Sequence, residues 1–423
     1  MIRKEVKEPL YYPRLEEIKA AAEIIKSVAV CTPLVKNLSY SERYQADVCF
    51  KREDMQPVRS YKIRGAYHKI SSLKELGTAE IACASAGNHA QGVALSCELL
   101  KVMGNIFMPS TTPKQKIEQV KMFGKSWVKV ILVGDTYDDA FEAASSFSLE
   151  HNFPFVHPFD DQKIIEGQGT VGLELALQSE KPIDFLFLPV GGGGLAAGVS
   201  AVLKNLSPQT KIIGVEPKGA PSMSEALRTG MNNKLDHIDK FIDGAAVKRV
   251  GDLNFNVCKT TLDACITVDE GAVCQKILDL YNQEGIIVEP AGALAVCGLD
   301  QYAEDIKGKQ VVCIISGSNN DITRTEEIKE RALLYKGLKH YFIVNFPQRA
   351  GALKQFVSEI LGEDDDITFF QYGKKHSRQN GSAIVGIQLR TEDDLIPLIN
   401  NMKNQGFYGE YLNDKPHLMN VLV

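Results

Sequence analysis

The sequence predicts an α/β protein in which parallel sheets are covered by helices and followed by a smaller α+β domain. Three observations lead to this prediction. Apolar, strand-like runs alternate with longer helical patterns from about residue 13 to 330, and such alternation is typical of parallel sheets covered on both faces. Glycine-rich or polar loops follow several of these strands. After residue 330 the order of the elements changes, which indicates a second domain.

The alternating region supplies the elements of the parallel sheets. Strands are expected at Asp47–Lys51, Glu80–Ala84, Asn105–Met108, Val128–Val133, Phe185–Val190, Lys211–Glu216 and Gln310–Ser316. Helices are expected between them at Gln91–Val102, Pro113–Phe123, Thr136–His151 and Leu195–Leu206. Ligands of such folds bind at the carboxyl ends of the strands, where most of the unusual loops fall.

The last part of the chain has a different pattern. A charged helix at Thr323–Lys336 precedes a turn-and-helix signal at Pro347–Leu353 and a second helix at Glu392–Gln405. Strands are expected at Lys339–Asn345, Ile367–Tyr372, Ser382–Leu389 and near Leu418–Val423. This β-α-β-β-α-β order resembles a ferredoxin-like module.

Composition excludes several classes of protein. With 423 residues, of which 44% are apolar and 24% charged, the chain can bury a large core, so intrinsic disorder, collagen-like repeats and disulfide-stapled miniproteins are excluded. The 48 basic and 53 acidic residues give a formal charge of −5 without a basic block. We therefore expect no nucleic-acid binding.

The cysteines and apolar runs bear on location. Nine scattered cysteines, with no Cys/His pairing at metal spacing, predict reduced thiols and no metal site. The first residues are charged where a signal peptide needs an apolar stretch. The uncharged run Phe185–Leu203 contains Pro189 and five glycines, so it fits a strand, a turn and a helix better than a membrane span. We expect a cytoplasmic protein that binds no membrane.

Four consecutive glycines, Gly191 to Gly194, follow the strand Phe185–Val190 and open the helix Leu195–Leu206. Without Cβ atoms, successive backbone N–H groups can surround an anion, and the helix N-terminus adds partial positive charge. No GK[ST] follows, and the spacing is not that of G-x-G-x-x-G. We predict a phosphate site, with a tight strand-to-helix turn as the alternative.

Lys62 lies at the start of a helical pattern in the segment Ser60–Ala66, between Arg59 and Arg64. Neighbouring cations and a helix N-terminus should lower its pKa and favour the neutral amine that a Schiff base needs. The alternative, a surface lysine at a helix start, is favoured while this motif stands alone.

A loop of small residues with an amide and a hydroxyl, Ser85–Gly92, follows the strand Glu80–Ala84. At a helix N-terminus these groups suit a small carboxylate. Alternatively, Ser85 or Asn88 is only a helix N-cap, and His89 only packs against the loop.

Two further strand or helix ends carry polar groups. Ser316 begins the loop Ser316–Asn319, and its hydroxyl is suited to hydrogen-bond a ring nitrogen. Alternatively, this loop is only a turn without a function. Glu289 begins the segment Glu289–Leu294 as a ligand contact or as a first-turn helix carboxylate.

Taken together and in this order, these motifs resemble those of the fold type II (tryptophan synthase β-like) pyridoxal-phosphate enzymes, specifically the threonine dehydratases (threonine ammonia-lyases). The resemblance covers about residues 10–330 and implies a two-lobed catalytic region at 1–330, with a small lobe at about 55–152 inserted in the large lobe. The module at 338–423 resembles the family's ACT-like regulatory domain. The combination resembles the biosynthetic form with a single regulatory module.

The resemblance also implies roles for single residues. Lys62 would hold pyridoxal 5'-phosphate as a Schiff base and act as the catalytic base. The phosphate would be bound by Gly191, Gly192, Gly193, Gly194 and Leu195. Tyr61 would line the ring, where the family often has phenylalanine, Asn88 would bind the 3-hydroxyl and Ser316 the pyridine nitrogen. The substrate carboxylate would be surrounded by Ser85, Ala86, Gly87 and His89.

The implied activity is the conversion of L-threonine to 2-oxobutanoate and ammonia by β-elimination, the first step of isoleucine biosynthesis. The resemblance further implies a homodimer or homotetramer and feedback inhibition by L-isoleucine. The strand-to-helix junction Asn345–Leu353 suits an amino-acid ligand, and valine is a second candidate effector. Catabolic threonine/serine dehydratases, serine racemases and β-replacing synthases share these motifs and remain alternatives. Two further alternatives concern the C-terminal module and the whole protein. The module at 338–423 serves only to join subunits, or the protein senses amino acids without catalysing a reaction.

Overall fold

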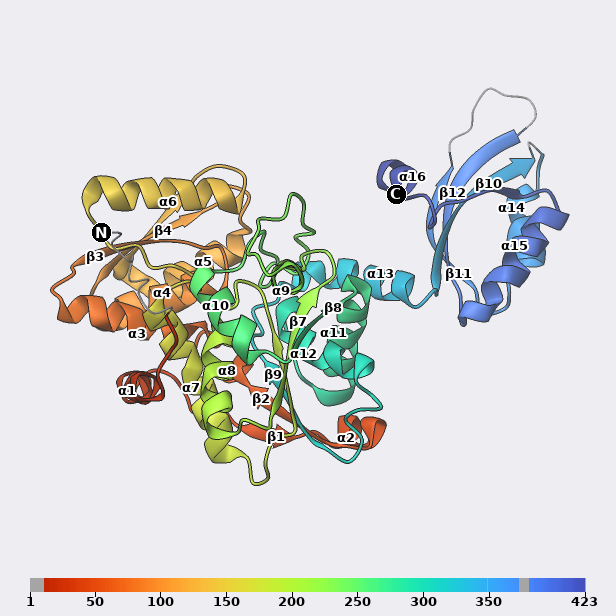
Figure 1. Ribbon diagram of the computed structural model, residues 1–423. Helices are drawn as coiled ribbons and strands as arrows, with labels where there is room; N and C mark the ends of the chain where they lie inside the picture. Colours follow the sequence, from red (N-terminus) through yellow and green to blue (C-terminus); the bar gives the residue numbers. More distant parts are fainter. Residues whose placement is uncertain (1–10, 348, 373–379, 423) are drawn as a thin grey trace, which may run out of the picture. The chain divides into compact units, whose positions relative to one another are not determined.

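The computed structural model describes residues 11–347, 349–372 and 380–422. The chain divides between Ile322 and Thr323 into two compact units, each with its own sheet and core (Figure 1).

A six-stranded sheet forms the centre of the first unit, in the order β1-β2-β9-β6-β7-β8. Its strands are β1 (Leu34–Lys36), β2 (Asp47–Arg52), β6 (Phe185–Pro189), β7 (Lys211–Pro217), β8 (Ala264–Val268) and β9 (Gln310–Ile315). Only β1 runs antiparallel to its neighbour, and the other pairs are parallel. The expected parallel sheet is confirmed.

Helices cover both faces of this sheet. They are α1 (Leu15–Ile25), α2 (Leu38–Tyr44), α7 (Gln162–Gln178), α8 (Gly194–Leu206), α9 (Ser222–Thr229), α10 (Asp252–Thr261), α11 (Glu270–Glu284) and α12 (Pro290–Gln301). Leu186 and Leu188 of β6 share a core cluster with residues of α7 and α8. The residue between them, Phe187, faces Gly298 of α12, because successive side chains of a strand point to opposite faces.

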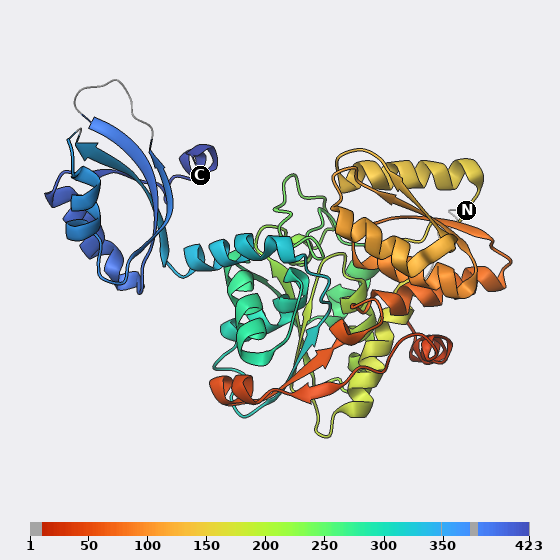
Figure 2. The ribbon, with the colours of Figure 1, turned by 180° about the vertical axis from the view of Figure 1, so that it is seen from behind.

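A second, three-stranded parallel sheet lies between β2 and β6 in the sequence (Figures 1 and 2). It contains β3 (Glu80–Ala84), β4 (Met103–Met108) and β5 (Val128–Leu132), with α3 (Lys62–Glu75), α4 (Asn88–Leu100), α5 (Lys114–Gly124) and α6 (Tyr137–His151) around it. Ile106 of β4 packs in the cluster shared with α3 and α4, and the next residue, Phe107, packs with α6. This sheet is therefore also covered on both faces.

The second unit has an antiparallel sheet in the order β11-β12-β10-β13. Its elements are α13 (Thr325–Tyr335), β10 (Lys339–Pro347), α14 (Ala352–Gln355), the π-helical turn Phe356–Ile360, β11 (Asp366–Tyr372), β12 (Asn380–Gln388), α15 (Leu395–Asn404), β13 (Tyr408–Tyr411) and α16 (Pro416–Leu422). Phe342, Phe356 and Leu398 belong to one core between sheet and helices. The β-α-β-β-α-β order is confirmed.

The strand expected near Leu418–Val423 is wrong. Residues 416–422 form α16, and Val423 lies outside the described residues. Pro416 at its first position suits a helix start, where the missing N–H is not needed. The sheet is completed instead by β13, whose Gly409 leaves room for the Ile343 carbonyl, 2.5 Å from where a Cβ would be. This strand has only four residues, and they include a glycine and a glutamate, so its apolar pattern is too weak to predict it.

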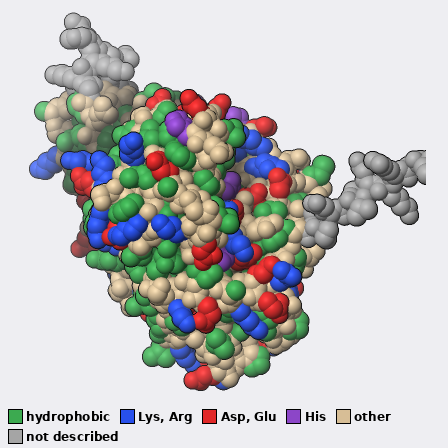
Figure 3. Space-filling model, turned by 90° about the vertical axis from the view of Figure 1, so that its left-hand side faces the viewer, with side chains coloured by type: hydrophobic (Ala, Val, Ile, Leu, Met, Phe, Trp, Pro, Cys, Tyr) green, Lys and Arg blue, Asp and Glu red, His purple; other side chains and the backbone are tan. Residues whose placement is uncertain are grey.

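Composition predicts a surface without a basic block and cysteines that are reduced, and the structure bears on both predictions. Acidic and basic side chains are interspersed on the face shown in Figure 3. Of the nine cysteines, all of them unpaired, Cys31 is exposed, Cys265 is intermediate and the others are buried. The free thiols fit the expectation of reduced cysteines. Among the described helices, none has the length and apolarity to cross a bilayer.

Candidate active site

Lys62 is the first residue of α3 and is largely buried. Its Nζ donates a hydrogen bond to the Pro158 carbonyl oxygen at 2.8 Å and lies 5.4 Å from the centre of the Tyr61 ring. Burial lowers the pKa of Lys62 to about 8, while Glu289 opposes the shift. The expected direction of this pKa shift is therefore confirmed, but its main cause is burial rather than the neighbouring arginines.

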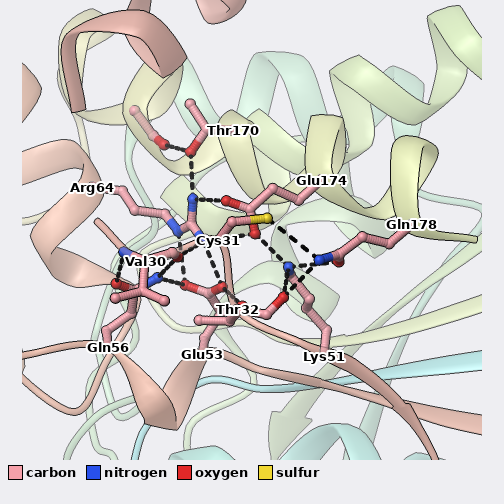
Figure 4. A network of polar contacts seen from close by, with 11 residues as sticks. Val30, Cys31, Thr32, Lys51, Glu53, Gln56, Arg64, Thr170, Glu174 and Gln178 are labelled. Carbon is pink, nitrogen blue, oxygen red and sulfur yellow. Dashed lines mark hydrogen bonds and ion pairs between the residues drawn. The ribbon is translucent and has the colours of Figure 1, made fainter. Parts of the chain in front are cut away.

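Arg64 points into a buried polar network with Glu53 and Glu174 (Figure 4). Its guanidinium donates to Glu53 at 2.7 and 2.8 Å and to Glu174 at 2.6 and 3.0 Å. Arg64 is 1% exposed and Glu53 is fully buried. The network also includes Lys51, which is bonded to Glu174 and to the Thr32 carbonyl oxygen. It ties the first turn of α3 to α7 and β2, and so fixes the backbone that carries Lys62.

The four glycines connect β6 to α8, as expected. Gly193 has φ +91° and is the N-cap of α8 without a side-chain capping bond. Gly192 must be glycine, because a Cβ there would lie 2.2 Å from the Phe159 ring. The Gly192 carbonyl oxygen accepts from the Gly251 N–H and from Asn254 Nδ2. The loop is thus held by its carbonyl side, which leaves the N–H groups at the start of α8 for an anion.

Ser85, Ala86 and Gly87 precede α4, whose first residues are Asn88 and His89. The helix therefore begins three residues before the expected Gln91. Its N-cap is Gly87, not Ser85 or Asn88, and no side chain caps it. Ser85 Oγ accepts instead from the Gly87 N–H at 3.2 Å. The N–H groups of this helix start suit a carboxylate.

The His89 ring is buried and bonded through Nε2 to the Val156 carbonyl oxygen at 3.1 Å. Burial lowers its pKa to about 3, so the ring is neutral and its Nε2 is the donor in this bond. The imidazole is engaged away from the helix start, and His89 can meet a substrate carboxylate there only through its backbone N–H.

Tyr61 and Ser316 lie side by side, since the Tyr61 N–H donates to the Ser316 carbonyl oxygen at 3.2 Å. Ser316 is 2% exposed, and its hydroxyl is 3.4 Å from the Ala291 carbonyl oxygen. That long contact is a weak hydrogen bond, so the Ser316 hydroxyl can turn to a better partner.

Three residues without an assigned role in the sequence also build the site. Phe159 supports the glycine loop with its ring, and Asn254 holds it with its amide. Asn319 donates from its side chain to Asn88 Oδ1 at 2.7 Å. Asn319 belongs to a motif that the sequence singled out, whereas nothing in the pattern around Phe159 or Asn254 marks them.

The residues present fit a pyridoxal-phosphate group. A largely buried amine of lowered pKa, a glycine loop with uncapped helix N–H groups, and open space beside Gly87, where a Cβ would meet no atom within 4 Å, lie around one region. Ser60 Oγ and Asn319 Oδ1 are buried without a hydrogen-bond partner among the described residues. Buried polar atoms are normally paired, so these two indicate that a ligand completes the site.

Comparisons with known proteins give the same answer. Residues 25–317 match the family model "Pyridoxal-phosphate dependent enzyme", and residues 330–422 match "C-terminal regulatory domain of Threonine dehydratase". The chain is 52% identical to the biosynthetic L-threonine dehydratase IlvA of Halalkalibacterium halodurans over 97% of its length and 99% of that protein. It is 50% identical to that of Bacillus subtilis over 97% of both chains. Among solved structures, threonine deaminase isoform 2 of Solanum lycopersicum, in its processed form, matches 78% of this chain and 99% of its own, with 38% identity and a TM-score of 0.70.

Proposed function

This chain belongs to the pyridoxal-phosphate-dependent enzymes as a biosynthetic threonine dehydratase, and from that premise we propose how its own residues deaminate L-threonine to 2-oxobutanoate and ammonia. The observation that carries the proposal is the largely buried Lys62 amine at the start of α3, beside the Pro158–Phe159 segment that supports the glycine loop.

Binding of the cofactor falls to groups from both sheets. Gly191, Gly192, Gly193, Gly194 and Leu195 would hold its phosphate at the start of α8. Tyr61 would lie against the ring, with Asn88 at the 3-hydroxyl and Ser316 at the pyridine nitrogen. When bound, pyridoxal phosphate supplies an electron sink for the electrons released at the substrate α carbon.

Lys62 Nζ would hold the cofactor and, once the substrate has displaced it, take the proton from the α carbon. With a pKa of about 8, the Lys62 amine is neutral in about a tenth of molecules at pH 7 and in about half of them at pH 8, which suits a base working in that range. An ordinary exposed lysine would be almost fully protonated in that range.

The other groups orient the substrate. Ser85, Ala86, Gly87 and the His89 N–H would receive its carboxylate at the start of α4, which places the α carbon toward Lys62. Ser316 would offer a neutral hydroxyl to the pyridine nitrogen. A hydroxyl would not keep a ring nitrogen protonated, and this would favour loss of the β-hydroxyl group from the substrate.

The purified protein is expected to produce 2-oxobutanoate from L-threonine, and added L-isoleucine is expected to suppress the production. The assay is ketoacid formation with and without isoleucine, and with L-serine as a second substrate. Absence of ketoacid from threonine would refute the proposed activity. Production that isoleucine leaves unchanged would refute only the proposed effector.

The proposed effector site is a pocket of about 430 Å³ in the second unit, a size typical of small-molecule sites. It is lined by Phe346, Pro347, Arg349, Ala350, Gly351, Ala352, Leu353, Phe370 and Tyr372, and so coincides with the junction Asn345–Leu353. Aromatic and aliphatic side chains suit the isoleucine side chain, and the Arg349 guanidinium suits its carboxylate.

Leu353→Glu is expected to raise the isoleucine concentration for half-inhibition at least about tenfold, because it brings a like charge to the effector carboxylate. Leu353 is 47% exposed, so the fold should tolerate the change. Ile396→Glu, at a 70% exposed position on α15, is the matched control. Deletion of residues 338–423 should remove the sensitivity altogether. Sensitivity that survives the deletion would refute a regulatory role for this module.

We also propose a homo-oligomer in the cytoplasm. The family membership and the regulatory domain support the oligomer, and the predominantly buried, unpaired cysteines support a reducing compartment. Size-exclusion chromatography with light scattering tests the oligomeric state.

A further inference from the structure

Glu289 is a carboxyl group beside the proposed cofactor site with no part in the steps above. It is the N-cap residue of α12 and only 6% exposed, yet its side chain makes no capping bond to that helix. Its carboxylate contacts instead the Asn88 side chain at the start of α4, beside the three-stranded sheet. A capping role therefore does not explain this glutamate.

Glu289, Asn88 and Asn319 form a closed ring of hydrogen bonds. Asn88 Nδ2 donates to Glu289 Oε1 at 2.5 Å, and the Asn319 backbone N–H donates to Glu289 Oε2 at 3.2 Å. Asn319 Nδ2 donates to Asn88 Oδ1 at 2.7 Å. The three residues come from separate segments, so the ring joins the start of α4, the start of α12 and the loop after β9.

The ring decides which way the Asn88 amide points. A side-chain amide can present either its oxygen or its nitrogen in a given direction, and its partners decide between the two. Asn319 Nδ2 uses both of its N–H groups, one for Asn88 Oδ1 and one for the Val58 carbonyl oxygen at 2.8 Å. Asn88 must therefore turn its oxygen to Asn319 and its nitrogen to Glu289. One N–H of Asn88 serves Glu289, and the second is left to donate to a ligand.

The ring needs an ionised Glu289, because only a carboxylate accepts at both oxygens. Burial raises the pKa of Glu289 to about 7, and Asp243 adds to the shift, whereas Asn88, Lys116 and the Asn319 N–H oppose it. At pH 8.5 Glu289 is therefore predominantly ionised, and the ring is complete.

We propose that Glu289 is a positioning residue that acts through Asn88 and holds the Asn88 amide in the orientation that donates a hydrogen bond to the cofactor's ring oxygen. The inference rests on the proposed function, in which Asn88 contacts the cofactor. In this role Glu289 acts through its hydrogen bond to Asn88.

Glu289→Gln tests this with little change of shape. The glutamine amide accepts at one end only, so its other end faces a donor, either Asn88 Nδ2 or the Asn319 N–H. The measurement is the dissociation constant of pyridoxal phosphate from the apoenzyme at pH 8.5, by absorbance titration. The proteins are the parent enzyme, Glu289→Gln, Asn88→Ala and the double variant. Glu270→Gln, a glutamate at the start of α11, is the matched control and should leave the constant unchanged.

Glu289→Gln is expected to weaken cofactor binding about tenfold in the parent enzyme, as loss of a hydrogen bond to a charged group does. In the Asn88→Ala background the same change should cost less than about twofold, because contacting residues are not additive. An equal loss in both backgrounds, or no loss in the parent enzyme, would overturn the inference.

Thermal unfolding of the apoenzymes shows whether each variant is folded. If Glu289→Gln does not fold, Glu289→Asp, which keeps the charge but shortens the reach to Asn88, is put through the same cycle with the same criterion. A parent enzyme that binds no pyridoxal phosphate through a lysine would refute the proposed function instead, so the two failures are distinguishable.

Discussion

Lys62→Ala is expected to lose both the absorbance of the lysine–cofactor bond and at least about a thousandfold in turnover of threonine. The side chain is proposed both to hold the cofactor and to move the α proton, and positioned bases alone contribute about 10²–10⁴-fold. The measurements are the absorbance spectrum of the reconstituted protein and the rate of 2-oxobutanoate formation.

Lys74→Ala is the matched control for this change, since Lys74 is an exposed lysine near the end of the same helix. It should keep both the spectrum and the rate. Turnover by Lys62→Ala equal to that of the control would remove the basis of the proposed mechanism.

Arg64→Met is expected to lower the free energy of unfolding of the first unit by about 3–5 kcal/mol, because it leaves the buried Glu53 without its cation. Burial acts to raise the pKa of Glu53, and Arg64 outweighs it and keeps that pKa below its ordinary value. Urea unfolding of the parent and variant proteins measures the difference.

Arg228→Met provides the comparison, because Arg228 pairs with Glu225 on a helix surface and its side chain is 70% exposed. An exposed pair of this kind contributes at most about 1 kcal/mol. Adding Glu53→Gln to Arg64→Met should recover part of the loss by removing the stranded charge. If Arg64→Met and Arg228→Met unfold alike, the network does not stabilise the fold.

The sequence predicts the strands and the loops at their ends well, because both depend on local patterns. The strand expected at Glu80–Ala84 matches β3 in both bounds, and the four glycines mark the end of β6. Short or polar strands such as β1 and β13 carry too little apolar signal to be recognised. Leu418–Val423 was apolar enough to suggest a strand, but Pro416 and the completed sheet favour a helix.

The partners of the polar residues could not be predicted. Arg64 was expected to act on Lys62, its near neighbour in sequence, yet it pairs with Glu53 and Glu174. Asn88 contacts Glu289, 201 positions away. Such contacts depend on how the two sheets face each other, which no local pattern contains. Residue types therefore indicate the chemistry of the site, and the tertiary fold decides which groups meet.

The insertion of the small sheet between β2 and β6 has a consequence for folding during synthesis. β3, β4 and β5 pair in the order in which they leave the ribosome, whereas β2 pairs with β9, whose register begins at Gln310. At about 5–20 residues per second, the ribosome needs on the order of tens of seconds to span that interval. Local pairings form faster than distant ones. We therefore expect the small sheet to assemble first, while the edge of β2 that pairs with β9 stays unpaired until the last strand of its sheet has been made.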